Sequence, residues 1–97
     1  MTELNATLEE LIADYEKLLK KPGSGGKKAG YENYLTVMRL FKDLNDPVER
    51  DEFVAIVARN TGISRASINS AIDFLLGYNA ITKMEGDKLV KRIAQTV

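Results

Sequence analysis

The sequence of 97 residues predicts a mainly α-helical protein with a small β-hairpin near its C-terminus. Three observations support this class. Apolar residues recur at intervals of three and four in four separate segments, which is the spacing of amphipathic helices. A segment rich in glycine, at residues 21–30, separates the first of these segments from the others. Two short segments that favour β-strands flank a Glu-Gly-Asp turn at residues 85–87.

Residues 3–20 predict the first helix. Its acidic residues lie towards the N-terminal end and its lysines near the C-terminal end, as the helix dipole favours. Apolar residues with heptad spacing form a seam along it: Leu4, Leu8, Leu11, Tyr15 and Leu18. Such a seam either packs on the same chain or pairs with a second copy. We therefore expect residues 1–20 to act in homodimerisation or as an adaptor helix, or to pack on their own domain.

Residues 21–30, KPGSGGKKAG, predict a flexible linker, because proline, glycine and serine end a helix and favour irregular backbone. The segment does not fit the phosphate-loop pattern. Lys21 stands in place of its first glycine, and Lys28 replaces the Ser or Thr that holds magnesium. We expect no nucleotide cofactor here, and we expect residues 31–97 to form a separate domain.

Two further helices open this domain. The first covers residues 31–44 and ends before Pro47, because a proline disfavours helix in the residue before it. Its expected core residues are Tyr34, Val37, Met38, Phe41 and Leu44. The second begins near Arg50 or Asp51 and ends at Gly62, a residue suited to the left-handed conformation that closes many helices. Its expected core residues are Phe53, Val54, Ile56 and Val57.

Residues 64–76 predict the next helix, with Ser64 as its N-cap. Only a short turn with Gly62 and the apolar Ile63 separates it from the preceding helix, which predicts helix-turn-helix geometry. One face is apolar: Ile68, Ala71, Ile72, Leu75 and Leu76. The opposite face carries Asp73 and four side chains suited to docking: Arg65, Ser67, Asn69 and Ser70. Arginine can pair with guanine, asparagine with adenine, and serine with a base or a phosphate.

The chain from residue 34 to 93, about two thirds of the sequence, resembles a winged helix-turn-helix domain. Gly77, Tyr78 and Asn79 end the helix, and strands at residues 81–84 and 88–92 then form a hairpin in the position of a wing. The resemblance is to small prokaryotic, archaeal and viral regulators of this superfamily. It implies a fold with a recognition helix at Ser64–Leu76 and a wing tip at Glu85–Lys88.

The resemblance also implies a function: a transcriptional regulator, or an accessory chromosome, plasmid or viral factor, that binds double-stranded DNA as a dimer. The four polar residues of the recognition helix would address the groove. Four residues of the wing would contact the DNA backbone: Lys83, Lys88, Lys91 and Arg92. A weaker resemblance, carried by RDEFVAIVARNTGISRASINSAID and EGDKLV, is to the HU and integration host factor family. It implies an architectural DNA-binding protein.

Composition limits the function classes. The chain has no cysteine and no histidine, which excludes thiolate zinc sites and removes the commonest general base, so we expect no enzyme, catalytic residue or metal site. The formal net charge is zero, although five positive and three negative residues follow Ile63. Neutrality and the acidic wing-tip residues Glu85 and Asp87 favour an alternative, a winged-helix module that docks a protein partner and has little DNA affinity.

No apolar run approaches the roughly 20 residues that a membrane span needs. The polar, acidic N-terminus is also unlike a signal peptide. We therefore expect a soluble, cytoplasmic protein without a membrane partner, associated with the nucleoid if it binds DNA.

Overall fold

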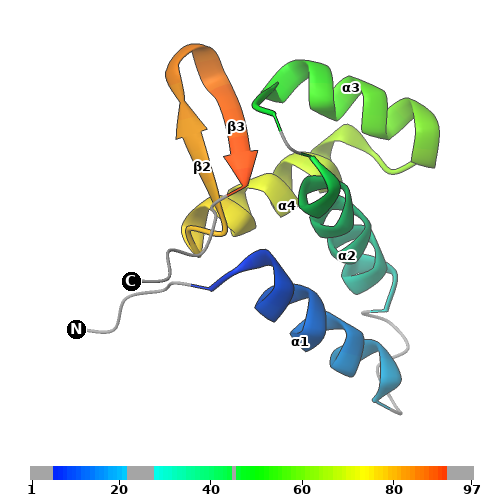
Figure 1. Cartoon of the computed structure of the whole chain (residues 1–97). Coiled ribbons are helices and arrows are strands. Elements are labelled where there is room, and N and C mark those ends of the chain that lie inside the picture. The colour runs from blue at the N-terminus through cyan, green and yellow to red at the C-terminus, as the bar shows by residue number, and fades with distance from the viewer. Residues whose placement is uncertain (1–5, 22–27, 45, 92–97) are drawn as a thin grey trace, which may run out of the picture.

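The computed structural model describes residues 6–21, 28–44 and 46–91, and this part of the chain is mainly helical with a small antiparallel sheet. Figure 1 shows these helices and a hairpin that projects beside α3. The elements in chain order are α1 (Leu8–Lys20), α2 (Lys28–Asp43), β1 (Val48–Glu49), α3 (Arg50–Thr61), α4 (Arg65–Gly77), β2 (Ile81–Met84), the 3-10 turn η2 (Glu85–Asp87) and β3 (Lys88–Lys91). The class predicted from the sequence, helices plus a C-terminal hairpin, is confirmed.

Helix α1 begins later than the sequence predicted. Its N-cap is Thr7, whose hydroxyl accepts a hydrogen bond from the Glu10 amide at 3.2 Å. The Glu10 carboxylate in turn accepts one from the Thr7 amide at 3.1 Å, which completes a capping box. This reciprocal cap fixes the start of the helix at Leu8. Ala6 and Thr7 are not helical, and residues 3–5 of the expected helix lie outside the described ranges.

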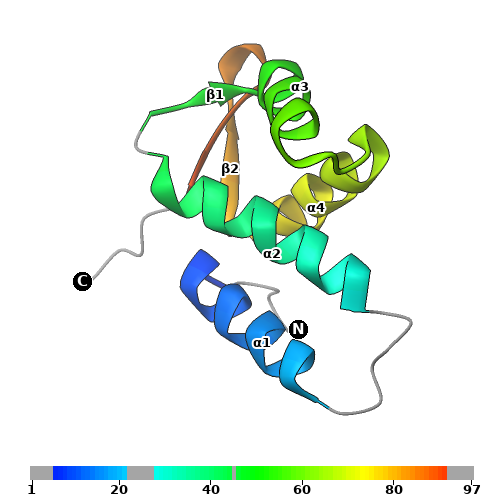
Figure 2. The same ribbon diagram turned by 90° about the vertical axis from the view of Figure 1, so that its right-hand side faces the viewer.

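Helix α2 begins at Lys28 and so includes the last three residues of the expected linker; residues 22–27 lie outside the described ranges. Lysine and alanine at 28 and 29 favour helix strongly enough to extend it backwards through Gly30. Helix α1 packs along α2 (Figure 2). The core face of α2 consists of Leu35, Val37, Met38 and Phe41.

The sheet has the strand order β1-β3-β2, with all neighbours antiparallel. β2 and the start of β3 match the predicted hairpin, and their register pairs Met84 with Lys88. The turn between them needs two residues with positive φ, which Gly86 (72°) and Asp87 (61°) supply. β1 was not predicted. With two residues, Val48 and Glu49, it is too short for an alternating pattern to reveal it.

The core lies where α4 meets α1, α2, α3 and the sheet. Helix α4 contributes Ile68, Ala71, Ile72 and Leu75, all of which are at most 1% exposed. The prediction that Ile56 of α3 faces the core is wrong, because its side chain is 42% exposed. Ile56 lies about 160° around the helix from buried Val54, on the side of α3 that lines an open groove between α3 and α2.

An aromatic cluster joins α1 to α2 and α4. The ring of Tyr15 stacks on Tyr34 with centroids 6.0 Å apart, and its other neighbours are Tyr31 at 5.4 Å and Phe74 at 5.5 Å. Tyr78 contacts Phe74 at 4.9 Å. Tyr15, which the sequence placed in a heptad seam, therefore contacts residues of its own chain.

We expect the protein to lose stability at alkaline pH through Tyr15. Burial raises the pKa of this hydroxyl above the ordinary value of 10.0, and the neighbouring phenols of Tyr34, Tyr31 and Tyr78 raise the pKa further. The folded state thus holds the proton more tightly than the unfolded state. The resulting stabilisation is complete below pH 10.0 and is lost as the pH rises through the folded pKa.

Urea denaturation at a series of pH values measures this loss. A Tyr15→Phe variant, which keeps the ring and lacks the hydroxyl, should lose less stability across the same pH range. Equal losses in both proteins would show that Tyr15 is not the group responsible.

Candidate nucleic-acid interface

The turn between α3 and α4 sets the position of α4. Gly62 closes α3 with φ 79°, and its amide donates a hydrogen bond to the Ala58 carbonyl at 3.0 Å. The Thr61 hydroxyl donates to the Val57 carbonyl at 2.6 Å and accepts from the Ile63 amide at 3.2 Å. The helix-ending position predicted for Gly62 is confirmed, and these bonds hold the turn on both sides.

Ser64 caps α4, as the sequence predicted. Its hydroxyl oxygen accepts a hydrogen bond from the Ser67 amide at 3.2 Å, and the same hydroxyl donates to the Ser67 hydroxyl at 3.0 Å. Ser67 is half-buried. The cap therefore engages one of the four side chains predicted to contact DNA, and Ser67 can still donate its own hydroxyl proton outwards.

Arg65 and Ser70 are the two predicted contact residues that α4 leaves most accessible. Both are exposed, and neither side chain has a hydrogen bond or ion pair with the described residues. Ala66, also exposed, adds only a methyl group beside them. This end of α4 is therefore an exposed polar surface with one positive charge that no described residue pairs.

Asn69 is held by a residue that sequence reasoning missed. Arg50, at the start of α3, donates from Nε to Asn69 Oδ1 at 3.0 Å and from a terminal nitrogen to Asp73 Oδ1 at 2.8 Å. The Arg50 side chain is 28% exposed. Since arginine only donates hydrogen bonds, the Asn69 oxygen must face it. The amide nitrogen of Asn69, a donor, remains available to a partner.

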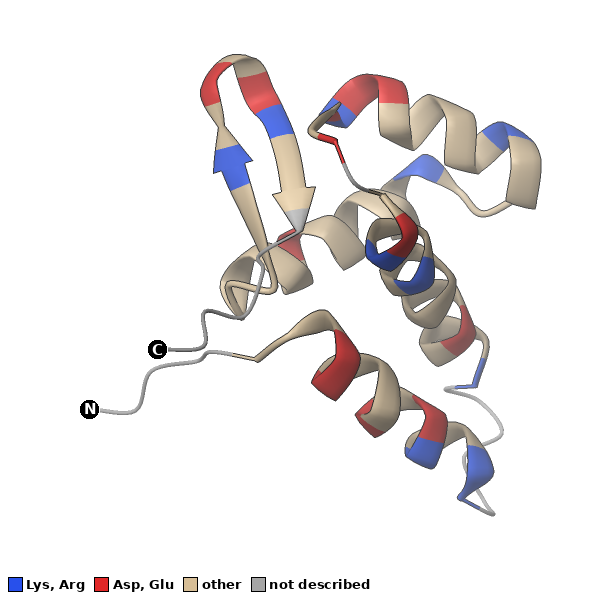
Figure 3. Cartoon of the chain, in the orientation of Figure 1, with Lys and Arg blue, Asp and Glu red and all other residues tan. Residues whose placement is uncertain are grey.

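The hairpin presents charges of both signs. Lys83 forms an ion pair with Asp87 at 3.0 Å, and exposed Lys88 lies opposite Glu49 in the strand register. Figure 3 shows positive and negative segments side by side at the hairpin tip, whereas α4 has little charge of either sign. Arg92 and the side chain of Lys91 lie outside the described part of the chain. Within its described part, the hairpin therefore has one lysine, Lys83, that an acidic residue already pairs.

The predicted dimer seam lies mostly inside the molecule. Leu8 is 2% exposed and Leu11 4%, and both belong to the core of their own chain. Tyr15 and Leu18 are half-buried, and Leu4 lies outside the described residues. A homodimer through this seam would therefore require α1 to leave its own chain and exchange with a second copy.

Two chemical properties bear on other kinds of site. Within residues 6–21, 28–44 and 46–91, no three acidic side chains gather in an arrangement that could hold a metal ion. None of the helices described has the length and apolar character needed to cross a bilayer.

In comparisons with known proteins, no family model, curated protein or solved structure matches this chain.

Proposed function

We propose that the protein binds double-stranded DNA as a winged helix-turn-helix domain, with α4 as the recognition helix. The observation that carries the proposal is the exposed face of α4, where Arg65 stands among small side chains at the N-terminal end of a capped helix. That end of the second helix enters the major groove in helix-turn-helix proteins. The three-residue turn before α4 and the hairpin after it support the same arrangement.

Three polar residues of α4 have distinct expected roles. Arg65 can donate two hydrogen bonds to a guanine edge. Asn69 presents its amide nitrogen and so favours an acceptor, such as a guanine or thymine oxygen or a phosphate oxygen. Ser70 is small enough to let the helix approach the groove closely. Lys88, which has no ion pair in the described part of the chain, supplies a backbone contact.

Binding of wild-type protein to a mixed-sequence duplex, measured by fluorescence polarisation at several salt concentrations, tests the proposal. Each neutralised phosphate contributes a slope of about −0.9 to the plot of log affinity against log salt. The few accessible cations predict a shallow but measurable slope. Arg65→Ala should weaken binding by about 1–3 kcal/mol if Arg65 contacts a base.

The matched control is Arg39→Ala. Arg39 is an exposed arginine of α2 whose ion pair with Glu16 of α1 places it away from α4. Its replacement should leave DNA affinity unchanged. Equal loss in the two variants would show only a general charge effect, and no salt-sensitive binding at low salt would contradict the proposal.

A second function, docking of a protein partner by the same surface, is favoured by one observation. The cations of the interface are partly offset, because Asp87 pairs with Lys83 and Asp73 pairs with Arg50. Folded protein that binds no duplex even at low salt would favour this docking module over the DNA-binding protein.

A further inference from the structure

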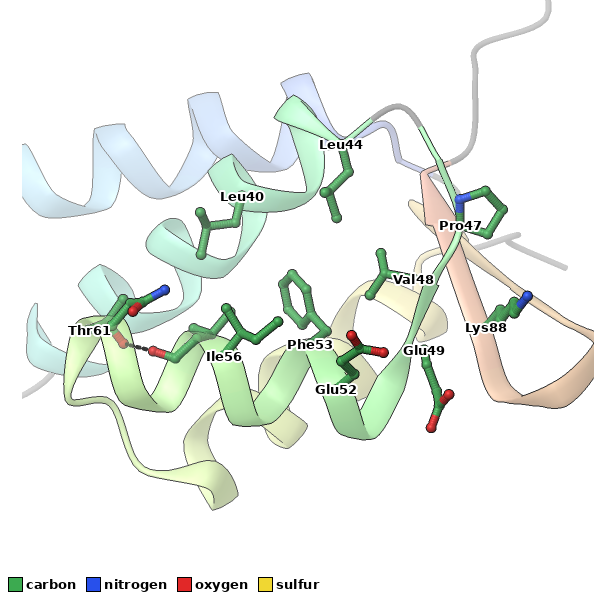
Figure 4. A pocket seen from close by; sticks show the side chains of 12 residues that line it. Leu40, Leu44, Pro47, Val48, Glu49, Glu52, Phe53, Ile56, Thr61 and Lys88 are labelled. Carbon is green, nitrogen blue, oxygen red and sulfur yellow. Dashed lines mark hydrogen bonds between the residues drawn. The ribbon is translucent and has the colours of Figure 1, made fainter.

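An open apolar groove runs between α2 and α3 and is closed at one end by β1. Its volume is about 630 Å³. Figure 4 shows Leu40, Phe53 and Ile56 pointing into the space between the two helices, with Leu44 and Val48 at the β1 end. Leu40 is 37% exposed and Ile56 42%. Two of the large apolar side chains that the protein leaves exposed thus face the same groove.

The groove has a definite charge pattern. Glu49 and Glu52 lie at its β1 end, and both are exposed. Neither carboxylate forms a hydrogen bond or ion pair with the described residues, although Lys88 pairs with Glu49 in the strand register. The far end is lined by the uncharged Asn60 and Thr61. Lys88 also lines the β1 end, so this end of the apolar channel carries two carboxylates and one ammonium group, a net negative charge.

We propose that this α2–α3 groove binds an amphipathic helix of a partner protein that is basic at one end. Helices that bind such grooves insert apolar side chains spaced at i, i+3 or i+4, and i+7. Leu40, Phe53 and Ile56 form the apolar walls for these side chains. Lysine or arginine at one end of the helix would pair with Glu49 and Glu52. The distance along α3 from Glu52 to Asn60 is about 12 Å, enough for about two turns of a bound helix.

The groove does not fit the other available occupants. A second copy docked groove to groove would place one concave acidic surface against another, with Glu52 near like charge. Nucleic acid is repelled by the same carboxylates. No residue of α4 lines the groove, so the proposed partner leaves the recognition helix free, and Lys88 is the one lining residue that is also assigned a DNA contact.

A synthetic peptide tests the proposal. The probe is a fluorescein-labelled, lactam-stapled, alanine-based helix of about 12 residues, with leucines at i, i+3 and i+7 and two lysines at its C-terminal end. The control peptide carries glutamates in place of the lysines. In polarisation titrations with the full chain, the lysine peptide should bind at least about tenfold more tightly than the glutamate peptide.

Three protein variants locate the binding. Ile56→Ala and Glu52→Gln change exposed residues of the groove, and each should weaken binding of the lysine peptide by about fivefold to tenfold. Met84→Ala removes an exposed apolar side chain on the hairpin, outside the groove, and should leave binding unchanged. Circular dichroism melting checks that all three variants are folded.

Several results would overturn the proposal. Failure of the lysine peptide to bind, equal binding of the two peptides, or binding that Ile56→Ala leaves unchanged would each contradict the proposal. A protein that sediments as a dimer and becomes monomeric with Ile56→Ala would show that a second copy fills the groove, which also overturns it.

Discussion

Replacing Leu11 with alanine is expected to lower the free energy of unfolding by about 2–5 kcal/mol, because the side chain is buried where α1 meets the core. The decrease has two parts: the favourable transfer of the leucine methyl groups from water to the core is lost, and a cavity remains in their place. Alanine keeps the helix propensity, so α1 itself is not weakened. Urea denaturation of the full chain measures the change.

Leu40→Ala is the matched control, since Leu40 is also a helical leucine but is 37% exposed, against 4% for Leu11. The free energy of unfolding should fall clearly less in Leu40→Ala than in Leu11→Ala. A truncated chain also tests whether α1 belongs to the core. If a chain lacking residues 1–20 unfolded at the same urea concentration as the whole protein, α1 would not belong to the core.

Much of the fold follows from local patterns in the sequence. Gly62 and Ser64 mark a helix end and a helix start through their own backbone conformation and side chain, so their positions could be read without knowing the rest of the structure. The same holds for the hairpin turn around Gly86. The late start of α1 was also local in origin, since the Thr7–Glu10 capping box lies within four residues. Other errors arose where the outcome depends on distant elements.

Ile56 and the α1 seam show this dependence. The pattern of α3 made Ile56 a core residue, but whether that edge of the helix is covered depends on where α2 lies. Likewise, the heptad pattern of α1 identifies an apolar stripe and cannot identify its partner. In the structure the partner is α2 of the same chain, with Phe74 of α4 reached through Tyr15.

The candidate site was predictable in part. Arg65 and Ser70 lie on the exposed face of α4, as helical periodicity required. The engagement of Asn69 by Arg50 was not predictable, because 19 residues separate them and only the packing of α3 on α4 brings them together. No spacing rule within a single helix detects such a pair.

Arg50→Met is expected to lower the free energy of unfolding by about 1.5–3 kcal/mol, the usual value for a hydrogen bond to a charged group. Methionine keeps much of the aliphatic volume but cannot donate to Asn69 Oδ1 or Asp73 Oδ1. Most of the loss should come from the part-buried bond to Asn69, because the Asp73 side chain is 67% exposed and its pairing is screened by water. Thermal and urea denaturation measure the change.

Arg39→Met is the matched control for stability. Arg39 pairs with Glu16 at 2.7 Å, and both side chains are about half exposed. Such surface pairs contribute about 0–1 kcal/mol. Equal losses in the two variants would mean that Arg50 does no more for the fold than a surface charge.

If the protein binds DNA through α4, Arg50 also orients the Asn69 amide towards the major groove of the DNA. Asn69→Ala and Arg50→Met should then each weaken binding to a preferred duplex, and the double variant should lose little more than either single variant. Fully additive losses of DNA affinity would show that Arg50 contributes independently of Asn69, for example by contacting a phosphate. A loss of stability without any change in DNA affinity would restrict the role of Arg50 to holding α3 against α4.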